Sequence, residues 1–162
     1  MTKEFLMIMD VQRGFLNEWT RFVPGKVEQI QHKFSNVLVT QFINPKNSLY
    51  RQLIGWRKFS KGFIDAKLAF SPRADIELVE KCTYTCLTPD VLSFIQMKGA
   101  KKVYLCGIAT DNCILKTAVD LFEAGLIPIV LVFACGSHGG PDYHSAGVKL
   151  LKRFIGEEQV NE

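Results

Sequence analysis

The sequence has no long apolar run near its amino terminus. The first run, Phe5 to Met9, is five residues long and ends at Asp10. That is too short for the core of a secretion signal or for a membrane span. We therefore expect a cytoplasmic protein with no membrane partner.

A strong excess of one charge is also missing. Lysine and arginine total 20, aspartate and glutamate total 16, and the basic residues are scattered singly or in pairs. A protein that binds nucleic acid gathers its basic residues into a patch or stripe. We therefore expect no nucleic-acid partner, which leaves a small-molecule substrate open.

Paired cysteine motifs are absent as well. The five cysteines are an odd number, and their spacings contain no C-x-x-C pair of the kind that binds structural zinc. We therefore predict reduced thiols rather than disulfides. Cys106 lies inside an apolar strand, and we assign it, together with Cys82, Cys86 and Cys135, to packing. Cys113 requires a different explanation.

What the chain does contain is enough apolar sequence for a folded domain. Hydrophobic residues make up 48% of the 162 residues, and charged residues make up 22%. A chain of about 150 residues buries roughly 70% of the surface that its unfolded form exposes, so a core can form without disulfides or a structural metal. We predict a single domain over residues 1–162.

Apolar runs of strand length alternate with stretches of helical period along the chain. This order predicts an α/β fold: a three-layer α/β/α arrangement with a mostly parallel, Rossmann-like sheet of five to six strands and helices on both faces. The polar residues 156–162 are expected to fray.

The expected strands are Phe5–Val11, Asn36–Ile43, Asp75–Lys81, Lys102–Ile108 and Ile127–Ala134. The expected helices are Lys26–Phe34, a short one within Leu49–Trp56, Pro89 to about Gly99 with Thr88 as N-cap, one capped by Thr110 and Asp111 that stops at Gly125, and Tyr143–Ile155.

Three chemically capable residues stand at the ends of predicted strands. Asp10 ends the first, Lys81 closes the third, and Cys113 follows the fourth. Ligands of parallel α/β sheets bind at these carboxyl ends. Cys113 lies in the first turn of a predicted helix, where free N–H groups and the helix dipole favour the thiolate. Asp10 could take the thiol proton, and Lys81 could tune both pKa values.

Each of the three also has a purely structural interpretation. A helical Cys is often a small core residue, an Asp at a strand end is often a turn or cap residue, and a Lys there is often solvated. Spacing alone leaves both interpretations open. Only the combination of the three indicates a catalytic site.

A resemblance to a known family spans almost the whole chain. Its segments are Met9 to Phe15 (MDVQRGF), Glu80-Lys81 followed by Tyr84, and Cys106 to Ile114 (CGIATDNCI) followed by Thr117-Ala118 and Gly125. Their order and separation resemble the signature segments of the isochorismatase-like cysteine hydrolases.

The resemblance implies a catalytic triad of Asp10, Lys81 and Cys113, with Cys113 as the nucleophile. It also implies a cis peptide bond between Ile108 and Ala109, and an oxyanion hole made by the N–H groups of Ala109 and Cys113. Finally, it suggests a homodimer or larger homo-oligomer.

Aromatic residues in or beside these segments are candidates for the pocket wall. Phe15, Trp19 and Tyr84 are the predicted substrate-binding residues, and Trp56 could join them. His138 and His144 follow the fifth strand and could act as proton carriers or substrate contacts, or lie at the surface.

The chain departs from the family pattern at two places. Nicotinamidases of this family carry an Asp-x-His metal pair after the second strand, whereas this chain has Thr40 to Asn44 (TQFIN) there and no histidine between His32 and His138. We therefore expect no metal and no other cofactor. Phe133 also stands where the family often has an Asp near the end of the fifth strand.

Three kinds of function remain open. Retention of Cys113 favours a hydrolase of non-peptide C–N bonds, which cleaves a small amide, or an ester, through a Cys113 thioester. An isochorismatase-type vinyl-ether hydrolase would instead use Asp10 as general acid and could dispense with the Cys. A catalytically idle binding subunit is the third alternative, and retention of all three triad residues counts against it.

Overall fold

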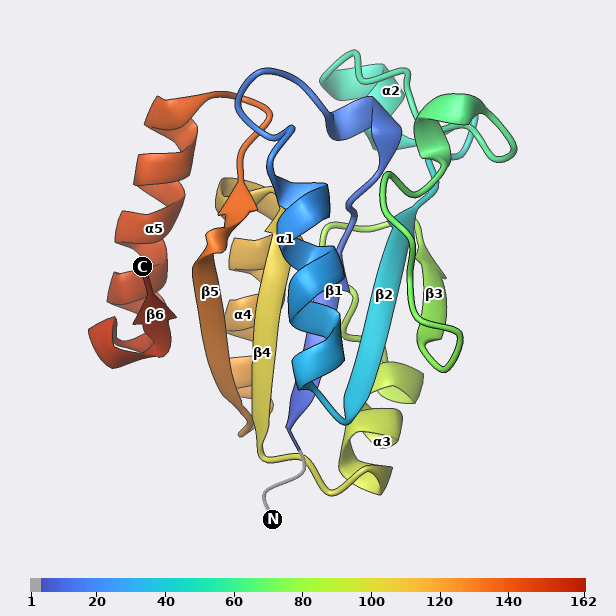
Figure 1. Cartoon of the computed structure of the whole chain (residues 1–162). Helices are drawn as coiled ribbons and strands as arrows, with labels where there is room; N and C mark the ends of the chain where they lie inside the picture. Colours follow the sequence, from blue (N-terminus) through green and yellow to red (C-terminus); the bar gives the residue numbers. More distant parts are fainter. Residues whose placement is uncertain (1–3) are drawn as a thin grey trace.

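The computed structural model describes residues 4–162. Within them, six strands form one sheet in the order β3-β2-β1-β4-β5-β6, and neighbouring strands pair in parallel. Helix α1 lies on one face of the sheet, and α3 and α4 lie on the other (Figure 1). This is the predicted three-layer α/β/α fold.

The strands are β1 (Phe5–Met9), β2 (Asn36–Phe42), β3 (Glu77–Lys81), β4 (Lys102–Ile108), β5 (Ile127–Gly136) and β6 (Val160–Asn161). The helices are α1 (Val23–Ile30), α2 (Leu49–Leu53), α3 (Pro89–Met97), α4 (Leu115–Glu123) and α5 (Pro141–Ile155).

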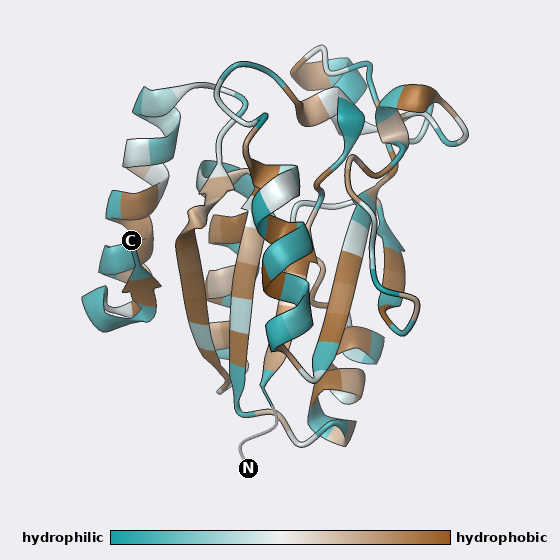
Figure 2. Ribbon diagram, viewed as in Figure 1, coloured by the Kyte–Doolittle hydropathy of each residue, from teal (hydrophilic) through white to brown (hydrophobic). Residues whose placement is uncertain are grey.

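The central strands supply the core. Every residue of β1 is fully buried, because β1 has a neighbouring strand on each side and a helical layer on each face. Figure 2 shows apolar residues along the central strands and polar ones on the outer surface of α1. The edge strand β3 instead exposes Glu77, Leu78 and Glu80. Side chains at the carboxyl ends of the central strands therefore stand on a rigid base.

Several helix boundaries follow from local signals. Thr88 caps α3 as predicted, since its Oγ1 accepts a hydrogen bond from the N–H of Val91 at 3.3 Å. Helices α1 and α5 begin earlier than predicted, at Val23 and Pro141. Each holds a proline in its first turn, where the missing N–H would have no helical partner. Within residues 4–162, every helix is too short or too polar to span a membrane.

Two predictions of local structure are wrong. Residues 156–162 do not fray: Val160 is buried and pairs with Val130, which adds β6 to the sheet. Thr110 and Asp111 do not cap a helix, because Thr110–Ile114 forms a π-helical turn that leads into α4. The Thr110 hydroxyl bonds the ring of His144 at 2.8 Å instead.

Gly107 allows β4 to approach β1 closely at the carboxyl edge. Its φ is +119°, and a Cβ at this position would overlap the carbonyl oxygen of Met9. The register of β4 against β5 also shifts between Leu105 and Gly107. The segment that follows β4 is therefore placed beside Asp10.

Candidate active site

The carboxyl ends of β1, β3 and β4 meet at one edge of the sheet, where they bring Asp10, Lys81 and Cys113 together (Figure 1). Lys81 Nζ lies 2.7 Å from Oδ2 of Asp10 and 3.5 Å from Sγ of Cys113. All three residues are buried, with at most 6% of their surface exposed. Residues from distant parts of the chain thus form one compact cluster.

Asp10 is held in a set orientation by its neighbour on β2. Its backbone N–H donates to Thr40 Oγ1 at 3.1 Å, and its Oδ1 accepts from the Thr40 hydroxyl at 2.6 Å. Its φ of +48° is in the left-handed region, which costs a non-glycine residue about 1 kcal/mol and is most easily adopted by Asp and Asn. Oδ2 is thereby left to face Lys81.

Lys81 is the charged centre of the cluster. Its Nζ donates to the carbonyl oxygens of Thr83 and Tyr84 at 2.7 and 3.0 Å, besides contacting Asp10 and Cys113. Burial alone would lower the pKa of Lys81, but the adjacent Asp10 carboxylate and Cys113 together outweigh burial and raise this pKa above its ordinary value. Lys81 therefore stays protonated.

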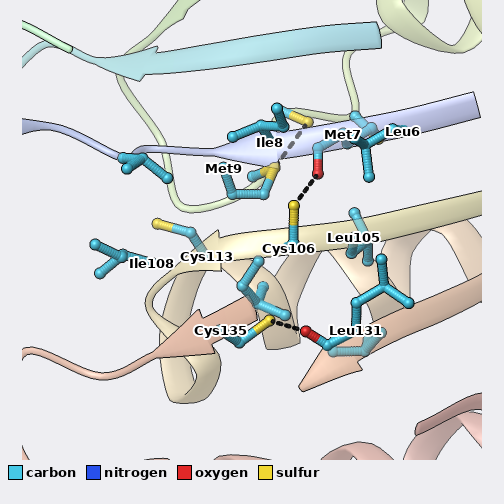
Figure 3. Packing of buried hydrophobic residues seen from close by; sticks show 14 of the residues in the cluster. Leu6, Met7, Ile8, Met9, Leu105, Cys106, Ile108, Cys113, Leu131 and Cys135 are labelled. Atoms are coloured by element: carbon cyan, nitrogen blue, oxygen red, sulfur yellow. Dashed lines mark hydrogen bonds between the residues drawn. The ribbon is translucent and has the colours of Figure 1, made fainter. Parts of the chain in front are cut away.

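Cys113 stands on the π-helical turn just beyond β4. The carbonyl oxygen of Ala109 accepts hydrogen bonds from the N–H groups of Asn112 and Ile114 at 3.0 and 3.1 Å, which holds the turn. The Ile108–Ala109 peptide bond is cis. Figure 3 shows Cys113 past the carboxyl end of β4, whereas Cys106, inside β4, points its sulfur toward the carbonyl oxygen of Met7.

The resting state of Cys113 differs from the sequence-based expectation. Burial raises the pKa of the Cys113 thiol, the Asp10 carboxylate raises it further, and Lys81 opposes both only in part. The expected preference for the thiolate is therefore wrong for the resting protein, because the thiol is buried against a carboxylate. A base must remove its proton during any reaction.

A cavity of about 100 Å³ opens above Cys113. The Phe15 and Phe59 rings stack with centroids 4.1 Å apart, and Tyr50 meets Tyr84 edge to face at 5.1 Å. The cavity is therefore mostly aromatic, with Cys113 in its floor. Its lining residues are Phe15, Phe42, Tyr50, Ile54, Trp56, Tyr84, Ala109, Asn112, Cys113 and His138.

The structure brings Phe15 and Tyr84 to this cavity but not Trp19. Thr20 donates its hydroxyl proton to the carbonyl oxygen of Phe15 at 2.7 Å, and the chain turns away from the cavity after Phe15. Trp19 consequently packs beside Gly140, is 44% exposed and lines a separate hollow. Its assignment to the substrate pocket is corrected here, since Trp56 provides the indole of the cavity wall.

Other expectations about single residues also change. Phe133 is 47% exposed and lines a different hollow, on the α5 side of the sheet. Cys82, assigned to packing, is exposed. His144 is hydrogen-bonded to Thr110, whereas His138 lines the cavity above Cys113.

Polar side chains hold the segment that closes the cavity. The Asn44 amide donates to the carbonyl oxygens of Trp56 and Lys58 at 2.8 and 3.0 Å. The Arg51 guanidinium donates to three backbone carbonyls, of residues 44, 45 and 57, and to the hydroxyl of Ser60. Sequence reasoning missed Phe42, Tyr50 and Ile54 as wall residues, whereas His138 was among the possible substrate contacts. No periodic pattern marks them; the Ser48 N-cap of α2 is the one local signal.

The residues after β2 do not fit the metal site of nicotinamidases. Gln41 donates its amide to the carbonyl oxygen of Ala66 at 2.7 Å, and the Asn44 amide is occupied by backbone contacts. Phe42 turns its ring to the cavity wall. Among residues 4–162, no group of three or more His, Cys, Asp or Glu side chains is arranged to hold a metal ion.

Comparison with known proteins identifies the family. The model of the isochorismatase domain matches residues 4–158. Isochorismatase domain-containing protein 2 of Xenopus laevis is 35% identical over 69 residues, which cover 42% of this chain but only 34% of that protein. The nicotinamidase of Acinetobacter baylyi is 24% identical over 172 residues, covering 80% of this chain and 79% of the relative.

Solved structures show the same fold. The pyrazinamidase of Pyrococcus horikoshii in complex with zinc superimposes with a TM-score of 0.85 and 21% identity, covering 98% of this chain and 97% of that one. An isochorismatase-like hydrolase from Alkaliphilus metalliredigens gives a TM-score of 0.84 and 18% identity, covering 94% and 92%. With the domain match over nearly its whole length, this chain belongs to the isochorismatase domain family.

Proposed function

We propose that this protein hydrolyses a small amide, or less readily an ester, through a thioester on Cys113. The observation that carries the proposal is the contact of one buried lysine, Lys81, with both Asp10 and Cys113 beneath an aromatic cavity. A nucleophile, a base and a fixed cation within contact distance are the groups that acyl transfer requires.

In the acylation step, Sγ of Cys113 attacks the substrate carbonyl carbon while Asp10 accepts the thiol proton. The carbonyl oxygen becomes an oxyanion, which we assign to the N–H groups of Ala109 and Cys113. The C–N bond then breaks, and Asp10 returns the proton to the departing amine. Lys81 remains an ammonium throughout and balances the negative charge of the carboxylate or thiolate.

In the deacylation step, water attacks the thioester carbonyl and gives its proton to Asp10. The C–S bond breaks, the acid product leaves, and the Cys113 sulfur recovers its proton from Asp10. The raised pKa of the Cys113 thiol favours this recovery. The residues present supply every role without a metal or cofactor.

The cavity limits the acyl group to a small one. An enclosed apolar cavity of about 150 Å³ can hold a benzene molecule, and this cavity of about 100 Å³ is smaller but open to the surface, so a single ring need lie only partly inside it. The similar proteins named nicotinamidase and pyrazinamidase make single-ring carboxamides the first compounds to test. This chain lacks the Asp-x-His metal pair of nicotinamidases, so a polar atom on such a ring would need a different partner in the cavity.

A screen of small amides and esters with intact-mass detection tests the proposal. Hydrolysis should be accompanied by an acyl adduct on Cys113, trapped when Asp10→Asn slows deacylation. Near-normal turnover by a folded Cys113→Ala variant would refute the thioester mechanism. Turnover of vinyl ethers by that variant would support the vinyl-ether alternative, in which Asp10 acts alone as general acid.

We also propose that the chain works as a homodimer or larger homo-oligomer. The support is a group of exposed apolar residues on and beside α2, including Leu49, Leu53 and Ile54. Light scattering coupled to size-exclusion chromatography measures the mass directly. A monomer at micromolar concentration would contradict this proposal.

A further inference from the structure

His138 lines the catalytic cavity but has no part in the triad. It follows β5, and its backbone carbonyl oxygen accepts a hydrogen bond from the Asn17 amide at 2.8 Å. Its ring centroid lies 4.9 Å from that of Phe15 and 5.4 Å from that of Trp56, tilted by about 40° to both. Two aromatic neighbours and a backbone anchor therefore hold the imidazole at the cavity wall.

The imidazole has unused hydrogen-bonding capacity. Its Nδ1 is buried and has no hydrogen-bond partner among residues 4–162. Buried polar atoms are nearly always paired, because an unpaired one loses its bond to water and gains nothing in return. Because Nδ1 has almost no accessible surface, a ligand in the cavity that this ring lines would meet the imidazole through its other nitrogen, Nε2, directly or through water.

The charge state of His138 defines what it can bind. Burial lowers the pKa of His138, Asp111 on the π-helical turn opposes that effect, and Lys58 from the facing segment adds to it. The ring is therefore neutral at neutral pH, with one nitrogen as donor and the other as acceptor. It suits a neutral polar atom, such as a ring nitrogen or a hydroxyl, held near the aromatic walls.

We propose that His138 determines substrate specificity by hydrogen bonding to a polar atom on the acyl group of the bound amide. The cavity would thus select a single-ring acyl group that carries such an atom over a hydrocarbon ring of the same shape. The inference rests on the proposed function, in which the cavity above Cys113 holds the acyl group.

Binding of an isosteric series tests this inference. Benzamide and the three pyridinecarboxamides differ only by one ring nitrogen in place of a C–H group. Dissociation constants are measured by calorimetry for the wild type, His138→Phe, His138→Gln and His32→Phe. His32 is exposed on the 3₁₀ turn after α1 and serves as the matched control.

We expect at least one pyridine isomer to bind the wild type about fivefold more tightly than benzamide, the effect of one net hydrogen bond. The preference should fall below about twofold in His138→Phe, persist in part in His138→Gln, and persist fully in His32→Phe. Each preference is the ratio of two dissociation constants measured on one variant. A loss of affinity that affects both ligands equally therefore leaves the ratio unchanged.

The inference is overturned if wild type binds every pyridine isomer no better than benzamide, or if the preference survives in His138→Phe. Hydrolysis of the same compounds is followed in parallel. A preference that depends on His138 without hydrolysis of these compounds would contradict single-ring carboxamides as substrates and keep the binding role of His138. Hydrolysis of these compounds with a binding preference that His138→Phe leaves unchanged would support the proposed function and overturn the inference about His138.

Discussion

The floor and the roof of the cavity above Cys113 are held in place by different interactions. The floor consists of Asp10, Lys81 and Cys113, which are buried at the carboxyl ends of β1 and β3 and on the turn after β4. The roof, residues 44–60, includes α2, whose Leu49 and Leu53 are 65% and 76% exposed. Hydrophobic burial therefore fixes the reacting groups, whereas the polar contacts of Asn44 and Arg51 fix much of the wall that meets the substrate.

This division separates chemistry from selectivity. A floor built into the core moves only if the sheet moves. Phe59 is the one fully buried apolar side chain of the roof, whose α2 is largely exposed, so the roof opens at lower free energy and tolerates change. Substitutions in the floor should therefore abolish reaction, and substitutions in the roof should change binding.

The largest effect is expected in the floor. Cys113→Ala and Asp10→Asn should each lower kcat/KM for amide hydrolysis by roughly three orders of magnitude or more, because triad members act as a unit. Asp10→Asn should also lower the free energy of unfolding by about 3 kcal/mol, since Lys81 loses its buried counter-ion. Steady-state kinetics and urea unfolding measure both. Comparable activity in all three proteins would sink the assignment of the floor.

The contact between Gly147 of α5 and the turn that carries Cys113 should give the next largest effect. A Cβ on Gly147 of α5 would lie 2.7 Å from the backbone nitrogen of Asp111, on the turn that carries Cys113. Gly147→Ala should therefore displace that turn, cost about 1–3 kcal/mol of stability and lower kcat by about tenfold. Gly25→Ala on α1 is the control, because nothing lies within 4 Å of its Cβ position and it should stabilise slightly. Equal behaviour of the two variants would show that α5 does not position the turn.

The roof should respond through binding. Arg51→Ala removes four hydrogen bonds that hold residues 44–60, so KM for a small amide should rise about tenfold while kcat falls less. Stability should fall by no more than about 1 kcal/mol, because Arg51 is largely outside the core. The comparison is with Arg153→Ala, an exposed arginine on α5. A large loss of kcat with unchanged KM would contradict the division between floor and roof.

The smallest effect concerns the thiol itself. Asp10 raises the pKa of Cys113, so Asp10→Asn should lower that pKa and increase the thiolate fraction at neutral pH. Alkylation of Cys113 by iodoacetamide should then become several-fold faster, even though hydrolysis is lost. Mass mapping across pH 6 to 9 gives the rates, with Cys86 and Cys135 as reporters of folding because burial raises the pKa of each thiol to about 12. Slower alkylation in Asp10→Asn would mean that Asp10 does not act on the thiol.

Local patterns in the sequence were enough to predict the sheet and the proximity of Asp10, Lys81 and Cys113. Uninterrupted apolar runs predict strands covered on both faces, as β1 and β4 are. Parallel strands align their carboxyl ends, so Asp10, Lys81 and Cys113 could be expected at one edge before any contact was known. These inferences succeed because each depends on residues adjacent in the chain or on a general rule of sheet topology.

Contacts between distant segments decided the rest, which only the tertiary structure shows. Trp19 and Trp56 look equivalent in sequence, yet only Trp56 lines the cavity, because Asn44 and neighbouring backbone hold its segment there. Val160 joins the sheet because β5 offers it a partner 30 residues earlier in the chain. The pKa of Cys113 rises because folding places it in a dry site beside Asp10. The sequence determined that Asp10, Lys81 and Cys113 lie at the carboxyl edge of the sheet. Packing between distant segments decided the protonation state of Cys113 and which side chains, His138 among them, line the cavity above it.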